Sequence, residues 1–264
     1  PSLIKHKLFR ELLMMENLPK PYQIEFTTLA DIPSGTGLGS SGAFMVSAIK
    51  ALKAFTKNYK SNIEIAELAC HIEIERLKQP VGKQDQYISA LGGICEFTFY
   101  KDDSVECNPL PISDINLSLL KDSIVMFYTG YKRSATEILS EQHSKTISDD
   151  KEILESLDSI KEMAINSRSL LINGDINQYG LLMQDHWYEK LKRSPNMCPN
   201  KIKNYIEIGL DNGALGAKLI GAGGGGFLLF VCNDKYQLRR KFNQLGLQEL
   251  NFDFDFLGAQ ILDT

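Results

Sequence analysis

Hydrophobic residues recur three or four positions apart through much of the first part of the chain, which is the period of an amphipathic helix. This spacing predicts helices over residues 5–15, 43–55, 62–78 and 84–91. Alternating apolar and polar residues, rich in β-branched and aromatic side chains, predict strands over residues 22–29 and 94–100. The polar stretch 101–108 is expected to form a turn region.

A second structural unit is expected after the closely spaced Pro109 and Pro111, where the apolar run 123–130 predicts a buried strand. We therefore predict an N-terminal domain over residues 1–117 and a C-terminal domain over residues 118–264. Within the C-terminal domain, the pattern predicts helices over residues 135–173, 176–192, 201–212 and 235–245. It predicts strands over residues 217–220 and 226–231. Helices and strands do not alternate regularly, so the pattern indicates an α+β fold.

The segment between the first predicted strand and the next helix is rich in glycine and serine, reading Ile-Pro-Ser-Gly-Thr-Gly-Leu-Gly-Ser-Ser-Gly-Ala-Phe at residues 32–44. Its backbone N–H groups and the positive end of the following helix favour an anion, and phosphate is the expected ligand. The hydroxyls of Ser40 and Ser41 can contact a phosphate or a magnesium ion. A tight turn with a serine capping the helix is the simpler alternative.

Two known phosphate-binding motifs do not fit this loop. Its glycines match G-x-G-x-x-G, but a second helix follows where a dinucleotide fold requires a strand that ends in an acidic residue. A Walker A loop requires a lysine after the last glycine, and this loop offers Ser40 and Ser41 instead.

The helix predicted over residues 62–78 places Glu73 on a face of small apolar residues. A buried carboxylate needs a compensating charge, and Mg²⁺ held together with a loop hydroxyl would supply one. Solvation of Glu73, or an ion pair with Arg76 or Lys78, is the alternative. Glu75 lies on another face and is the competing metal ligand.

Asp85 follows a Pro-Gly turn and lies at the start of the helix predicted over residues 84–91. A carboxylate is stabilised and held still in that position, as a general base requires. An ordinary cap of the helix is the alternative.

A second glycine-rich segment, Ile-Gly-Ala-Gly-Gly-Gly-Gly-Phe-Leu-Leu at residues 220–229, lies between two predicted strands. It also matches G-x-G-x-x-G, but an apolar strand follows it rather than a helix. Four consecutive glycines cost backbone entropy and exceed what a hairpin needs. We therefore expect this segment to approach another chain segment closely, or to approach ligand phosphates.

Several strings together resemble the GHMP small-molecule kinases. Residues 33–43 resemble the phosphate-binding motif of that superfamily, and residues 221–227 resemble its C-terminal glycine motif. Within the superfamily, the chain is similar to the D-glycero-D-manno-heptose 7-phosphate kinases. The strings that carry this closer resemblance are Gly-Lys-Gln-Asp-Gln-Tyr at 82–87, Phe-Tyr-Thr-Gly at 127–130, Arg133-Ser134 and His186-Trp187.

The resemblance implies a two-domain α+β kinase that binds ATP and a sugar in its cleft. Its N-terminal domain would resemble the second domain of ribosomal protein S5, and its C-terminal domain an α/β plait. ATP and Mg²⁺ are the implied cofactors. By the same resemblance, the ATP- and phosphate-binding residues are Pro33, Gly35, Gly37, Leu38, Gly39, Ser40 and Ser41.

The resemblance gives Asp85 the role of general base, which takes the proton from the sugar hydroxyl as that oxygen attacks the γ-phosphoryl group. Lys83 is expected to hold Asp85 ionised. Ser40, Ser41 and Glu73 are the implied magnesium ligands.

The sugar site is expected to draw on residues of the C-terminal domain. Lys132 and Arg133 follow a predicted strand and a glycine, so one of them is expected to bind the phosphate of the substrate through charge-assisted hydrogen bonds. His186, Gly223 and Gly224 are the other candidates. For Lys132, Arg133 and His186, a surface position without such a role is the alternative.

Composition narrows the possible partners and the compartment. The chain has 29 Lys and Arg against 33 Asp and Glu, without long runs of either sign, and so lacks the basic patch of a nucleic-acid binder. Its five cysteines are widely spread, which argues against a disulfide framework and a zinc site and favours the reducing cytoplasm. The apolar runs are shorter than the ~20 residues that span a bilayer, so we expect no membrane association.

These inferences predict an ATP-dependent kinase that phosphorylates the anomeric hydroxyl of D-glycero-D-manno-heptose 7-phosphate to the 1,7-bisphosphate. Such an enzyme contributes to nucleotide-activated heptose for a surface polysaccharide, and a homodimer is a further expectation. A related fucose or galactose kinase is one alternative, and a non-catalytic nucleotide-binding relative is another. The chain starts at Pro1 without a counterpart of the family's N-terminal motif, so we expect its beginning to be missing.

Overall fold

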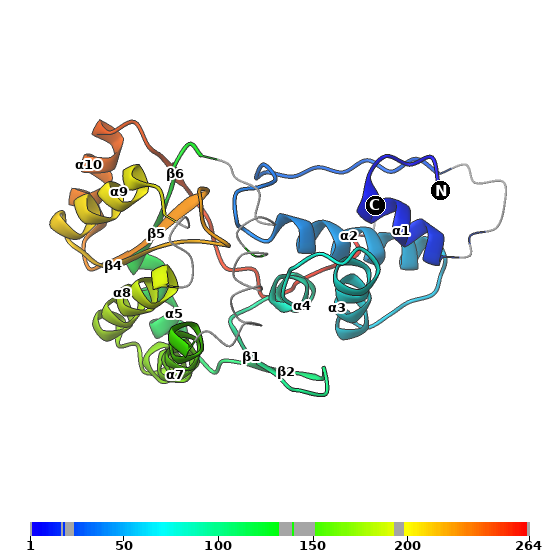
Figure 1. Ribbon diagram of the computed structural model, residues 1–264, viewed down its shortest axis with the longest axis horizontal. Helices are drawn as coiled ribbons and strands as arrows, with labels where there is room; N and C mark the ends of the chain where they lie inside the picture. Colours follow the sequence, from blue (N-terminus) through cyan, green and yellow to red (C-terminus); the bar gives the residue numbers. More distant parts are fainter. Residues whose placement is uncertain are drawn as a thin grey trace. The chain divides into compact units, whose positions relative to one another are not determined.

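The computed structural model of the protein describes residues 2–16, 18, 24–131, 139, 151–192 and 198–262. The chain folds into two compact units, each drawn in Figure 1. The first comprises Pro1–Ser34, Gly39–Cys107 and Phe254–Thr264, and the second comprises Gly35–Leu38 and Asn108–Asp253. The main division thus follows Cys107, ahead of the boundary at residue 117 that we predict, and the chain's last segment lies with the first unit.

Helices build most of the first unit. They are α1 (Lys7–Met15), α2 (Ser40–Phe55), α3 (Asn62–Cys70), the π-helix η1 (His71–Arg76) and α4 (Gln84–Leu91). A two-stranded sheet of β1 (Cys95–Phe99) and β2 (Val105–Pro109) accompanies them. The apolar stripes of the helices meet in one core, whose fully buried members include Met45, Ile49, Leu52, Ile65, Ala66, Ala69, Ile72 and Ala90.

The helix predicted over residues 62–78 changes its winding partway along. Ser61 and Glu64 cap its start with a reciprocal capping box, which satisfies backbone N–H groups that a helix start leaves free. After α3, the chain widens into η1, where the Leu77 N–H donates to the Ile72 carbonyl over 3.0 Å. Such single π turns occur frequently at functional sites.

Two predictions for the first unit are wrong. Burial alternates over residues 24–27, where Ile24 and Phe26 pack against the core, but residues 24–29 pair with no described strand. An alternating pattern specifies which side chains turn inward, but it does not supply a partner strand. The expected turn region 101–108 contains most of β2, in which the half-buried Val105 and Cys107 alternate with exposed polar residues and Val105 packs against the core.

The second unit is built on a four-stranded antiparallel sheet in the order β4-β5-β3-β6. These strands are β3 (Ile124–Tyr128), β4 (Ala214–Leu219), β5 (Phe227–Cys232) and β6 (Gln248–Leu250). The helices of the unit are α5 (Asp114–Ser123), α7 (Lys151–Asn173), α8 (Ile176–Lys192), α9 (Asn200–Asp211) and α10 (Lys235–Gln244). Figure 1 shows α9 and α10 on one side of this sheet and α7 and α8 on the other.

The sheet and its helices enclose a second apolar core. Phe127, Phe230 and Phe242 form its aromatic centre, with the Phe127 and Phe242 rings stacked 4.6 Å apart. On the other side, α8 lies backbone to backbone on β4, because a Cβ on Gly216 would lie 1.9 Å from the Gly180 carbonyl oxygen. The α+β prediction is confirmed, although α5 and β6 were not among the predicted elements.

Candidate functional site

Glu73 lies at the centre of a buried polar cluster in the first unit. Its side chain is fully buried, as the predicted face of small residues requires. The Ser41 hydroxyl donates to Glu73 Oε1, and Gln86 Nε2 donates to Glu73 Oε2 over 2.6 Å. Three elements, α2, η1 and α4, therefore meet at one carboxylate.

Glu73 is neither solvated nor paired with Arg76. Arg76, the proposed ion-pair partner, binds Glu11 on α1 over 2.8 Å. Glu75, the competing metal ligand, is exposed and lies 2.7 Å from His71 Nδ1. Glu73 is thus the carboxylate that accepts the hydrogen bond from Ser41 at the start of α2.

Asp85 packs against the same end of α2. A Cβ on Gly39 would lie 3.1 Å from Asp85 Cγ, and a Cβ on Gly42 would lie 3.0 Å from Asp85 Cβ. A side chain at either glycine would therefore crowd Asp85, which would have to move by a few tenths of an ångström. The Asp85 carboxyl keeps an exposed side, yet the protein around it removes enough water to raise its pKa above the ordinary value.

Neither capping alternative describes these residues. The cap of α2 is Gly39, in the left-handed conformation at φ 68°, and no side chain caps the helix. Lys83 is the cap of α4, again without a side-chain cap bond, and Asp85 lies inside the first turn. The hydroxyl of Ser41 and the carboxylate of Asp85 are therefore not used to start their own helices.

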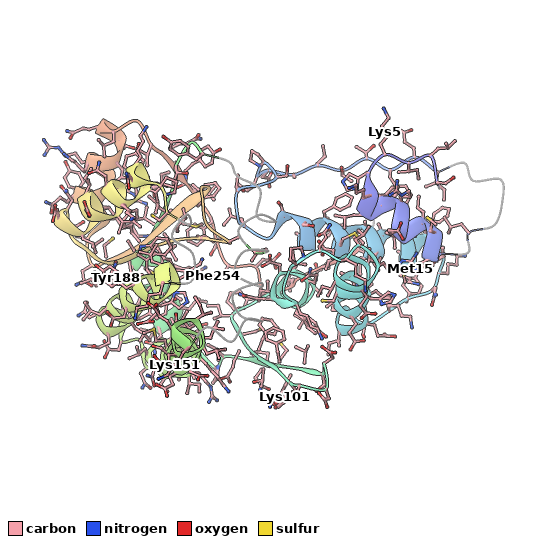
Figure 2. The ribbon with its side chains drawn as sticks, in the orientation of Figure 1. Lys5, Met15, Lys101, Lys151, Tyr188 and Phe254 are labelled. Carbon is pink, nitrogen blue, oxygen red and sulfur yellow. The ribbon has the colours of Figure 1, made fainter. Side chains whose placement is uncertain are left out.

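The expectation that Lys83 holds Asp85 ionised is wrong. Lys83 Nζ donates to the Asp103 carbonyl oxygen over 2.8 Å and pairs with Asp103 Oδ1 over 3.0 Å. Asp103 belongs to the turn between β1 and β2, where Figure 2 labels Lys101. A neighbouring ammonium would lower the pKa of Asp85, whereas burial raises it.

The donor set around Glu73 fits a hard divalent cation that also binds a nucleotide. In the described part of the chain, no group of three or more His, Cys, Asp or Glu residues can hold a metal ion. Mg²⁺ does not need such a cage, because it commonly binds one or two carboxylates together with phosphates and water. Glu73 and Ser41 offer oxygen ligands side by side, and Gln86 Oε1 is a further buried oxygen without a described partner.

In the second unit, the two glycine-rich segments cross each other. A Cβ on Gly37 would lie 2.8 Å from the Ile220 carbonyl oxygen, and a Cβ on Gly221 would lie 2.5 Å from Gly37 Cα. A Cβ on Gly226 would lie 2.0 Å from the Thr36 carbonyl oxygen. The expectation of a close approach to another chain segment is confirmed for Gly221 and Gly226.

Neighbouring groups hold the second glycine segment in place. Gly226 N–H donates to the Tyr131 carbonyl over 2.9 Å, and its own carbonyl accepts from the Thr129 N–H and hydroxyl. The buried Lys190 of α8 donates from Nζ to the carbonyls of Leu219, over 3.5 Å, and Gly221. The loop is therefore fixed at both of its ends.

The structure describes most, but not all, of the remaining predicted site residues. His186 is half-buried on α8, while Gly223 and Gly224 both have positive φ, 114° and 79°. Lys132 and Arg133 lie outside the described residues. Of the loop residues, Pro33 and Gly35 are exposed, whereas Leu38 and Ser40 are half-buried.

Gln86 is the site residue that sequence reasoning missed. Its neighbour Asp85 attracted attention as an acid at a helix start, but nothing in a one-dimensional pattern distinguishes a structural glutamine from one that binds a carboxylate. Helical geometry offers one signal: Gln86 follows Asp85 on α4, so when Asp85 faces solvent, Gln86 is turned toward the core.

A glycine-rich start to α2 and a buried carboxylate beside it, in a chain of two units, are the features expected of a phosphate-binding class of fold. Family models of this class match the chain: the GHMP kinases N terminal domain matches residues 4–93, and the GHMP kinases C terminal domain matches residues 167–248. The chain belongs to the GHMP kinase family.

Individual relatives within the family are similar to most of this chain. The chain is 34% identical over 221 residues to D-glycero-alpha-D-manno-heptose 7-phosphate kinase of Campylobacter jejuni, covering 83% of this chain and 65% of the relative. It is 30% identical to L-fucokinase/L-fucose-1-P guanylyltransferase of Bacteroides fragilis, covering 80% of this chain and 22% of the relative. The chain thus spans less than two thirds of the length of these relatives.

A solved structure has the same fold. The crystal structure of a D-glycero-D-manno-heptose 1-phosphate kinase from Bacteroides thetaiotaomicron superposes with a TM-score of 0.71 at 23% identity. The superposition covers 98% of this chain and 76% of that one. The likeness shows that the two-domain α+β fold is that of a GHMP kinase.

Proposed function

We propose that the protein is an ATP-dependent sugar kinase that phosphorylates the anomeric hydroxyl of D-glycero-D-manno-heptose 7-phosphate, giving the 1,7-bisphosphate. The observation that carries the proposal is the joint packing of Asp85, Ser41 and Glu73 at the glycine-rich start of α2. Membership of the GHMP kinases and the similarity to the Campylobacter heptose 7-phosphate kinase support the reaction and the substrate.

Asp85 is the general base of the proposed reaction. Its carboxylate accepts the proton of the anomeric hydroxyl as that oxygen attacks the γ-phosphoryl group of ATP. The raised pKa makes Asp85 a stronger base than an ordinary aspartate, and its exposed side leaves an oxygen accessible to a substrate. Because Gly39 and Gly42 carry no side chains, Asp85 approaches the start of α2 closely.

Glu73, Ser41 and Ser40 would hold Mg²⁺. When bound, the ion neutralises negative charge on the phosphate oxygens of the nucleotide. The free N–H groups at the start of α2, which no side chain caps, remain available to phosphate oxygens. We assign nucleotide phosphate binding to the loop that precedes them: Pro33, Gly35, Gly37, Leu38, Gly39, Ser40 and Ser41.

The remaining assignments concern the sugar and the whole protein. Lys132 or Arg133 binds the 7-phosphate, and His186, Gly223 and Gly224 contribute to the sugar site. A homodimer and a cytoplasmic location complete the proposal. The five cysteines are free thiols, which agrees with a reducing compartment, and none of the described helices is long and apolar enough to cross a membrane.

A fucose kinase is the second candidate, because the Bacteroides fragilis relative is a fucokinase at 30% identity. Such an enzyme would need no cation for a substrate phosphate. Lys132→Ala and Arg133→Ala therefore distinguish the candidates. A rise of KM for the phosphorylated sugar supports the heptose 7-phosphate, and an unchanged KM contradicts it.

The deciding experiment measures ATP consumption with Mg²⁺ and one of four acceptors: D-glycero-D-manno-heptose 7-phosphate, unphosphorylated heptose, fucose or galactose. Turnover with the 7-phosphate alone is the expected result. Turnover with fucose or galactose replaces the substrate assignment. Nucleotide binding without turnover on any acceptor indicates a non-catalytic relative.

A further inference from the structure

Gln86 is the only buried glutamine of the described first unit, and it is bound to the carboxylate proposed to hold the metal ion. Its side chain is 2% exposed, and Glu73 is 0% exposed. Hydrogen bonds to an ionised carboxylate are about twice as strong as those between neutral groups. The 2.6 Å contact between Gln86 Nε2 and Glu73 Oε2 is therefore a strong restraint on the carboxylate.

Glu73 determines the orientation of the Gln86 amide. Gln86 Oε1 is buried without a hydrogen-bond partner among the described residues. Leaving such an acceptor unpaired costs about 1–3 kcal/mol. A reversed amide would direct Oε1 at the negatively charged Glu73, so the carboxylate holds the amide in the orientation that leaves Oε1 unpaired.

The backbone around Gln86 allows little rearrangement. A Cβ on Gly42 would lie 3.1 Å from the Gln86 backbone nitrogen, so α2 and α4 touch at this point. The Gln86 side chain therefore starts from a fixed position in the first turn of α4 and spans directly to η1.

This arrangement divides the two oxygens of Glu73 between two neighbours. Oε2 is engaged by Gln86, and Oε1 lies beside the Ser41 hydroxyl. The Ser41 hydroxyl can rotate its proton away from Oε1 and offer a lone pair to a cation, whereas the Gln86 amide nitrogen offers only N–H groups to Oε2. A cation that binds next to Ser41 thus has Oε1 available and not Oε2. Mg²⁺ accepts single oxygens in a strict octahedron, whereas Ca²⁺ readily takes both oxygens of a carboxylate.

We propose that Gln86 is a positioning residue that restricts Glu73 to single-oxygen coordination and thereby makes the nucleotide site select Mg²⁺ over Ca²⁺. The inference rests on the proposed function insofar as Glu73 and Ser41 hold the metal of a bound nucleotide. It goes beyond that function because it assigns metal discrimination to a residue that need not contact the metal.

The test substitutes Gln86→Met, which keeps the length of the side chain and removes its donor. The matched control is Gln184→Met in the second unit, where a 7% exposed glutamine accepts from the Ala217 N–H over 2.9 Å. Both variants remove one buried amide, so both are expected to lose similar stability. Gln86→Leu is a second variant with the same chemistry.

Calorimetry then measures the binding of a non-hydrolysable ATP analogue in saturating Mg²⁺ and in saturating Ca²⁺, without sugar. The wild type is expected to bind the Mg²⁺ complex at least ~10-fold more tightly than the Ca²⁺ complex. Loss of a residue that orients a metal ligand typically weakens metal binding by about 10–100-fold. Gln86→Met and Gln86→Leu are therefore expected to lower the Mg²⁺/Ca²⁺ ratio by about tenfold or more, and Gln184→Met to leave it unchanged.

Two results overturn the inference. One is a wild type that binds both complexes equally well, which requires no variant to fold. The other is an unchanged ratio in a folded Gln86 variant. Failure of the proposed function looks different, because a wild type that selects the Mg²⁺ complex but phosphorylates no sugar leaves this inference intact.

Discussion

Replacing Gly226 with alanine tests whether the crossing of the two glycine-rich segments supports the second unit. The new Cβ would lie 2.0 Å from the Thr36 carbonyl oxygen, so one of the two backbones must move by about 1 Å to reach the ~3 Å contacts of real side chains. Movement of Gly226 disturbs its hydrogen bonds to Tyr131 and Thr129.

The expected loss follows from these contacts. A residue with a side chain at φ 101° is strained by about 1–3 kcal/mol. Each weakened hydrogen bond adds about 0.5–1.5 kcal/mol. We therefore expect Gly226→Ala to lower the free energy of unfolding of the second unit by about 3–7 kcal/mol.

Gly246→Ala is the matched control, because Gly246 has φ 74° and a Cβ there would meet nothing within 4 Å. It keeps the conformational strain and removes the crowding, so a loss of about 1–2 kcal/mol is expected. Urea unfolding is followed by the fluorescence of Trp187, the single tryptophan, which is 2% exposed in the core of the second unit. Equal losses in the two variants, within about 0.5 kcal/mol, would refute the role of the crossing.

Three further predictions concern individual charged groups. Asp85→Asn is expected to lower turnover by about 10²–10⁴-fold while nucleotide binding is retained. Because the pKa of Asp85 is raised in the folded protein, ionisation of Asp85 disfavours the fold. The variant is therefore expected to be more stable than the wild type above the folded-state pKa, and equally stable below the ordinary pKa of aspartate. Full turnover of the variant would contradict the base assignment. Burial lowers the pKa of Lys218, so Lys218→Met is expected to raise the urea midpoint of unfolding at pH 7. This gain is expected to shrink toward pH 10, where the lysine of the unfolded chain also loses its proton. A gain that does not change with pH would contradict this prediction. Lys132→Ala and Arg133→Ala are expected to raise KM for a phosphorylated sugar while KM for ATP stays constant, as initial rates at varied concentrations of each would show.

Local patterns predicted most of the described helices closely, although not α5, because helical periodicity depends only on residues three or four positions apart. The predicted helices 84–91 and 176–192 agree with α4 and α8 at both ends. Burial of Glu73 also followed from its helical face. The widening of the helix at η1 did not, because it is a change of backbone winding that no apolar repeat records.

Contacts between distant residues limited the rest of the prediction. Lys83 lies close to Asp85 in sequence, yet its ammonium binds Asp103, twenty residues further along the chain. The bond between Gln86 and Glu73 likewise joins two turns of chain that only the packed helices bring together. The strand β2 has only two apolar positions, Val105 and Cys107, which is too short an alternation to distinguish a strand from a turn, so only pairing with β1 reveals it.

The segment Phe254–Thr264 affects the order in which the two units can complete their folding. It packs within the first unit, where the Gly93 N–H donates to the Asp255 carbonyl over 2.6 Å and the Ala259 N–H donates to the Ala90 carbonyl over 3.1 Å. During synthesis, the sheet of the second unit is complete once β6 has emerged, whereas the first unit still lacks these contacts. The helices α1 to α4 are therefore translated before the sheet of the second unit, but they complete their contacts after it.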